Sequence, residues 1–150
     1  MVSVFDIAKW FLSRESMTHK KLQKLCYYAQ AWFCALYDGE PLFKENFEAW
    51  VHGPVCRELY PRYADYGWSE IPQTTKNDDS FDEETLNLLN AVWDLYGQYS
   101  GDQLEELTHK ELPWQNQRTG LKAYEPSNNV ISITDMRNYY LSEYEKAQND

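Results

Sequence analysis

Apolar residues recur every three or four positions in several stretches of the chain, which is the spacing of a helix with one buried face. The first stretch begins after Ser3, a residue that can cap a helix, and Asp6 completes a capping box with it. A second and longer stretch begins after Thr18 and ends at the turn-forming Gly39 and Pro41. The sequence therefore predicts two N-terminal helices, and the second is the best-defined element of the chain.

A different pattern follows in the segment NFEAWVHG, where apolar and polar positions alternate as they do in a strand. Gly53 breaks the alternation, and Pro54 suits the first position of a helix, where its missing N–H leaves no bond unmade. The pattern predicts a strand, a sharp turn and a new helix that runs to Gly67. In this interpretation Trp50 and His52 lie on one face of the strand and can seal the joint.

Three further helices are predicted in the second half of the chain. Each pattern begins with a serine that is followed three residues later by an acid or amide, namely Ser80 with Glu83, Ser100 with Gln103, and Ser132 with Asp135. The first of these helices is apolar around so much of its circumference that we expect it to be central. Pro113 begins a short turn-like element, and short strands are predicted at 68–71 and 129–132. The expected fold is mostly α (α+β), a single compact domain with a small β element and about six helices.

Length and charge narrow this picture. With 150 residues the chain has the size of one ordinary domain, and we interpret residues 1–150 as one folding unit. A net charge of -10 disfavours binding to nucleic acid. Aromatic residues make up 16% of the chain and supply partly polar, adhesive surface, which fits a protein that binds other proteins.

The expected location is the cytoplasm. The N-terminal stretch lacks the pattern of a signal peptide, and no apolar run approaches the roughly 20 residues that cross a bilayer. Cys26, Cys34 and Cys56 form no CxxC pair and sit in apolar stretches, which predicts buried free thiols in a reducing compartment.

Candidate chemistry is sparse. The chain has no phosphate-binding glycine loop, no HExxH motif and no paired CxxC, and its histidines, His19, His52 and His109, lie on different predicted elements, so no metal or cofactor is expected. A catalytic alternative uses His52 and His109 as acid and base with Cys56 as nucleophile. A packed thiol and a histidine bonded to a backbone carbonyl explain the same residues, and we favour this structural interpretation.

Three segments resemble the Panacea domain family, which includes SocA-like antitoxins and phage-associated proteins. They are KLQKLCYYAQAW at 21–32, PLFKENFEAWVHGPVCRELYPRY at 41–63 and LEELTHKELPWQNQR at 104–118. The resemblance extends over essentially the whole chain and is weakest at 68–100 and after 119. The matching positions are Trp50, His52, Gly53, Pro54, Tyr60, His109, Pro113 and Trp114. We interpret these residues as fold-defining first and as candidates for interaction second, with no catalytic residue among them.

The resemblance implies a non-enzymatic antitoxin that binds and neutralises a toxin encoded beside it. SocA-like relatives also deliver the toxin to the ClpXP protease, so a ClpXP-type protease is a second implied partner. Two alternatives remain, a phage accessory protein that binds a host factor and a hydrolase that uses His52, His109 and Cys56. The sequence leaves open the identity of the toxin, the contact face, the oligomeric state, and whether neutralisation proceeds by occlusion or by delivery to a protease.

Overall fold

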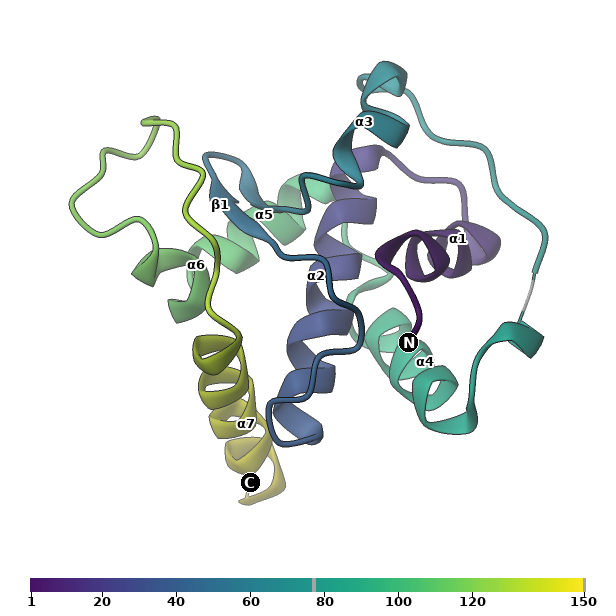
Figure 1. Cartoon of the computed structure of the whole chain (residues 1–150). Coiled ribbons are helices and arrows are strands. Elements are labelled where there is room, and N and C mark those ends of the chain that lie inside the picture. Colours follow the sequence, from purple (N-terminus) through teal and green to yellow (C-terminus); the bar gives the residue numbers. More distant parts are fainter. Residues whose placement is uncertain (77, 150) are drawn as a thin grey trace.

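A computed structural model describes residues 1–76 and 78–149 and shows a helical chain with one β-hairpin (Figure 1). The helices are α1 (Val4–Arg14), α2 (His19–Leu36), α3 (Tyr60–Tyr63), α4 (Glu83–Tyr96), α5 (Gly101–His109), α6 (Leu112–Asn116) and α7 (Ile133–Asn149), with 3-10 turns η1 (Ala64–Tyr66) and η2 (Asp78–Ser80). The strands are β1 (Glu48–Trp50) and β2 (Gly53–Val55). The predicted mostly α fold with a small β element is confirmed.

Helix α2 is the centre of the molecule. It contacts α1, α4, α5, α7 and β2, and Figure 1 shows α7 on one side of it with α1 and α4 on the other. Even its polar side chains Gln23, Lys24 and Gln30 are buried. The prediction that the helix after Ser80 is central is wrong, because α4 covers only one side of α2 and leaves Leu95 54% exposed.

Local capping explains where most helices begin. The predicted caps are confirmed at Ser3 with Asp6 (α1), Ser100 with Gln103 (α5) and Ser132 (α7), and α2 begins after Thr18 as predicted. The predicted box of Ser80 with Glu83 is wrong. Ser80 belongs to η2, and the carboxylate of Asp82 caps α4 by accepting the N–H of Thr85 at 2.8 Å.

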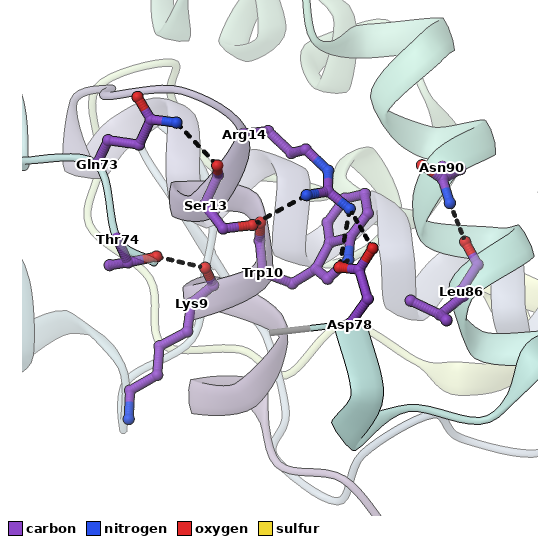
Figure 2. A network of polar contacts seen from close by, with 9 residues as sticks. All are labelled: Lys9, Trp10, Ser13, Arg14, Gln73, Thr74, Asp78, Leu86 and Asn90. Atoms are coloured by element: carbon purple, nitrogen blue, oxygen red, sulfur yellow. Dashed lines mark hydrogen bonds and ion pairs between the residues drawn. The ribbon is translucent and has the colours of Figure 1, made fainter. Parts of the chain in front are cut away.

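Polar contacts with α1 place the segment that precedes α4 (Figure 2). The guanidinium of Arg14 donates two hydrogen bonds to Asp78 at 2.9 and 3.0 Å, and the indole N–H of Trp10 donates a third at 3.0 Å. Gln73 and Thr74 donate to main-chain carbonyls of α1. The predicted surface loop is therefore tied to α1 on both sides of residue 77.

A hairpin replaces the predicted joint between a strand and a helix. β1 and β2 pair antiparallel with Trp50 opposite Gly53, so residues 51–52 form a two-residue turn. Pro54 is therefore in a strand, and the next helix, α3, begins only at Tyr60.

The reason for the hairpin lies in a contact with α2. The side chain of Gln23 donates to the carbonyl of Cys56 at 3.1 Å and accepts its N–H at 2.8 Å. These two bonds satisfy the N–H of Cys56 and one acceptor site of its carbonyl just after β2, and the same carbonyl also accepts the N–H of Tyr60 at 3.1 Å, where α3 begins. Gly53 adopts φ 104°, which lets the chain reverse direction.

The other two predicted strands are single bridges. Ile71 pairs with Met17, and Val130 pairs with Glu48 at the outer edge of β1. Cys26, Cys34 and Cys56 are buried free thiols, as predicted. Within 1–76 and 78–149, no helix has both the length and the apolar character needed to cross a membrane.

Candidate functional site

A cleft of about 690 Å³ opens between the first half of α2, the β-hairpin, the α3–η1 segment and the loop before α7. Three aromatic rings line it, those of Trp50, Tyr60 and Trp68. Its basic lining residues are His19, Lys20, Lys24, His52 and Arg57, and in the described part of the chain no aspartate or glutamate lines it. Although the chain has 24 acidic residues, the charged residues that line this cleft are basic.

The hairpin that forms one wall is held by the segment after α5. The indole N–H of Trp114 donates to the carbonyl of Trp50 at 2.9 Å, and the ring of His109 stacks on Trp114 with centroids 3.9 Å apart. The buried guanidinium of Arg118 donates to the carbonyl of Ala49 at 2.8 Å and to two carbonyls of the following loop. These contacts make the hairpin a rigid wall.

Gly53 is the point where the hairpin comes closest to α2. A Cβ atom at this position would lie 2.7 Å from Cε of Lys24 and 3.1 Å from Oγ1 of Thr108. A glycine is thus required both by the backbone angle and by the space that Lys24 occupies.

Lys24 is a buried lysine without a carboxylate partner. Its side chain is 1% exposed, and its ammonium donates one hydrogen bond, to the carbonyl of Pro54 at 3.3 Å. No ion pair to it forms within the described residues. Burial lowers the pKa of Lys24 to about 7, with the charge of Glu105 opposing the shift and that of Lys20 adding to it.

Among the other basic residues of the cleft, Lys20, His52 and Arg57 have acidic partners. Lys20 pairs with Asp102 at 2.8 Å and also with Glu105, whose second oxygen lies 3.1 Å from Nδ1 of His52. Arg57 pairs with Glu48 at 2.9 Å. The charge of Lys20 and Arg57 is therefore already balanced at the rim, whereas that of Lys24 is not.

A second buried ionisable group lies on the other side of α2. Glu111, between α5 and α6, accepts hydrogen bonds from the hydroxyls of Tyr28 and Tyr140, both at 2.8 Å. The hydroxyl of Tyr140 lies 3.1 Å from that of Tyr27, and the ring of Tyr28 stacks on Tyr96 at 4.0 Å. Burial raises the pKa of Glu111 to about 7, against the two phenol bonds, which favour the carboxylate. We call these four tyrosines with Glu111 the tyrosine cluster.

The structure divides the eight predicted site residues into those that line the cleft and those that do not. Those that reach the cleft are His52, which is exposed, and the half-buried Trp50 and Tyr60; those that support it from within are Gly53, Pro54, His109, Pro113 and Trp114. The rings of Trp50 and Tyr60 lie 5.0 Å apart. The hairpin thus brings the segments around residues 50–60 and 105–114 into contact.

The side chains of the hydrolase alternative have separate partners. Cys56 is fully buried, and burial raises the pKa of its thiol to about 12. His109 stacks on Trp114 and its pKa is lowered by burial, while His52 pairs with Glu105. No hydrogen bond joins any two of the three residues, so the arrangement gives this alternative no support. Among residues 1–76 and 78–149, no three His, Cys, Asp or Glu side chains form a group that could hold a metal ion.

Sequence reasoning did not identify Lys24, Trp68 or Arg118. One signal for Lys24 was visible in HKKLQK, the densest basic run of the chain, because it occupies the first turns of a predicted helix. Cations at a helix N-terminus oppose the helix dipole and need another explanation. Nothing local distinguishes Arg118, whose acceptor on β1 is 69 residues away in the sequence.

Comparison with known proteins identifies the family of the chain. The family model described as "Antitoxin SocA-like, Panacea domain" matches residues 22–115, which run from the first turns of α2 into α6 and include the hairpin and Lys24. No curated protein and no solved structure matches the chain. Since the match covers more than half of the sequence, the chain belongs to the SocA-like antitoxin, Panacea domain family.

Proposed function

We propose that this protein is the antitoxin of a toxin–antitoxin pair and neutralises its cognate toxin by direct binding. Family membership over residues 22–115 is the observation that carries the proposal. The protein then acts in the cytoplasm as a stoichiometric binding partner and has no catalytic role.

The contact face that we propose is the rim of the cleft. Trp68 is 82% exposed, and the side chain of His52 at the hairpin turn is 73% exposed. Trp50 and Tyr60 are half-buried between them. Exposed aromatic side chains beside a pocket are the usual anchors of a protein interface.

One physical feature supports this face. Trp114 and Arg118 fix the hairpin before any partner arrives, so binding needs little ordering of the chain.

Co-expression with the product of the adjacent gene tests the proposal. Wild-type protein is expected to restore growth and to co-purify with the toxin, whereas Trp68→Ala loses both because an interface anchor is removed. Tyr144→Ala is the matched control, since Tyr144 is a 40% exposed aromatic residue on α7, outside the cleft. Circular dichroism checks that both variants fold. Absence of rescue and co-purification with the wild type refutes the antitoxin role, and equal protection by both variants refutes the face.

The same assay in cells that lack ClpXP distinguishes two mechanisms of neutralisation, occlusion of the toxin and its delivery to a ClpXP-type protease. Occlusion predicts unchanged rescue, because binding alone inactivates the toxin. Rescue that disappears in these cells, with binding intact, identifies a proteolytic adaptor. If the protein instead co-purifies with a host factor and no neighbouring toxin, the phage accessory alternative holds.

A further inference from the structure

We propose that the cleft beside Lys24 binds a small organic anion, a flat ring system that carries one phosphate or carboxylate group. The anionic group faces Lys24, and the ring lies among Trp50, Tyr60 and Trp68. This proposal goes beyond the antitoxin role and does not depend on it.

Lys24 supplies the first argument. An ammonium group has three N–H donors, and in the described structure that of Lys24 makes one hydrogen bond, of 3.3 Å. A buried charge without a partner is costly, and its low pKa reflects this cost. Because Lys24 lines an open cleft, an anion can provide the missing acceptors.

The start of α2 supplies an independent argument. This helix of 18 residues begins at the cleft, and its first turn carries His19, Lys20 and Lys21 with no acidic residue. The dipole at a helix N-terminus favours negative charge, and within the protein Asp102 and Glu105 pair with Lys20 while Glu15 pairs with Lys21. An anion in the cleft at this end of α2 is stabilised by the helix dipole.

The walls and the remaining charges define the class of ligand. The cleft volume of about 690 Å³ falls in the range of small-molecule sites, and its three aromatic rings favour a flat, apolar body. Lys20 and Arg57 are already paired with carboxylates, which leaves Lys24 as the lysine or arginine of the cleft that is free to accept an anion. One uncompensated cation suits a single anionic group and not a polyanion.

Titration calorimetry with the purified protein tests this inference. The probes are adenosine monophosphate for the phosphate arm and indole-3-acetate for the carboxylate arm, with adenosine and inorganic phosphate as fragments. We expect at least one probe to bind about tenfold or more tightly than either fragment, because ring and anion are both recognised. Weak, equal binding of probes and fragments overturns the proposal, as does the absence of binding by both probes.

Proton uptake identifies the group that receives the anion. At pH 8 most Lys24 side chains are neutral, and an anion that pairs with Lys24 draws a proton from the buffer. The measured heat is then expected to differ between HEPES and Tris in proportion to their ionisation enthalpies. Binding without any such difference overturns the role of Lys24.

Two variants and one control complete the test. Lys24→Met keeps the length of the side chain and is expected to weaken binding 10- to 100-fold, by about the value of one charged hydrogen bond, and to abolish proton uptake. Trp68→Ala, at an exposed position, is expected to weaken binding about tenfold. Lys9→Met, on the exposed side of α1, leaves binding unchanged. If Lys24→Met does not fold, the affinity of Trp68→Ala and the comparison of HEPES with Tris test the proposal. Unchanged affinity of Trp68→Ala for the probes refutes the role of the aromatic rings.

Discussion

Lys24 and Glu111 are both buried next to α2, and burial moves the pKa of each to about 7 from opposite directions. Glu111 sits in the tyrosine cluster and accepts two hydrogen bonds of 2.8 Å. Lys24 makes one hydrogen bond of 3.3 Å and borders the cleft. The two groups differ in whether the protein itself provides their partners.

This difference separates a structural role from a binding role. A buried ionisable group that accepts hydrogen bonds from two helices ties secondary elements together, as Glu111 ties α6 to α2 and α7 through one carboxylate oxygen. A buried charged group that borders a cleft and has unused hydrogen-bond donors can bind a ligand there. Family membership alone does not make this distinction, since both residues lie within the matched range.

The largest expected effect is that of Gly53→Ala. The substitution forces a side chain onto φ 104° and places Cβ 2.7 Å from Lys24, so we expect a loss of about 4 kcal/mol of stability. Gly120→Ala is the matched control, because Gly120 also has a positive φ, 82°, with nothing within 4 Å of its Cβ position, and it is expected to lose about 1 kcal/mol. Urea unfolding measures both.

A double substitution sharpens this result. In a Lys24→Ala background the clash is absent, and the cost of Gly53→Ala is expected to fall toward that of Gly120→Ala. An unchanged cost would show that the hairpin does not depend on its fit to Lys24.

Removal of the acceptor from the tyrosine cluster is the next largest effect. Glu111→Leu leaves the hydroxyls of Tyr28 and Tyr140 without their acceptor, and we expect a loss of about 3 kcal/mol. Glu111→Gln keeps an acceptor oxygen and is expected to be much milder. Thermal and urea unfolding measure the stability of both variants. Equal stability of the two variants would contradict the structural role of Glu111.

The two groups predict opposite pH dependences of stability. The folded pKa of Glu111 lies above its ordinary value of 4.5, so its contribution is fully present at low pH and falls by about 2 kcal/mol between pH 5 and pH 7. The folded pKa of Lys24 lies below its ordinary value of 10.5, so stability rises by about 1.5 kcal/mol between pH 7 and pH 8.5. Urea unfolding across these ranges measures both slopes.

Matched variants assign each slope to its residue. Glu111→Gln is expected to remove the fall below pH 7 and to leave the rise above it, and Lys24→Met is expected to do the reverse. Differences between wild type and variant cancel the titration of other groups. A slope that survives both variants belongs to neither residue.

The smallest expected effect on stability is that of His52→Ala. The imidazole is an exposed partner of Glu105, and its removal is expected to change stability by less than about 0.5 kcal/mol. A loss of toxin binding with unchanged stability would place His52 on the contact face. A large loss of stability would instead make it a structural residue like Glu111.

The sequence predicted the parts of the fold that depend on near neighbours. The caps at Ser3, Ser100 and Ser132 were identified because a capping bond spans three residues. The spacing of apolar residues predicted one buried face for α1 and for α2, whereas α2 is buried all around between Leu22 and Ala31. The caps also show the limit of this reasoning, because Asp82 and not Ser80 caps α4 once the bonds from α1 fix Asp78.

The sequence could not predict the parts that depend on distant partners. The segment at Gly53 and Pro54 has the local features of a helix start, and the bonds of Cys56 with Gln23, 33 residues away, make it a hairpin instead. Of the predicted site residues, His52, Trp50 and Tyr60 do reach the cleft, but Lys24 was not among them.

The sequence by itself determined a helical protein that resembles the Panacea family, with the caps of α1, α5 and α7 and the buried free thiols, because periodicity, capping and composition are local properties. Only the tertiary structure decided that Lys24 is buried beneath Gly53, without a carboxylate partner among the described residues, and that Glu111 is enclosed by tyrosines. The physical reason is that the ionisation of a buried group depends on which distant atoms surround it, and the order of residues does not specify those atoms.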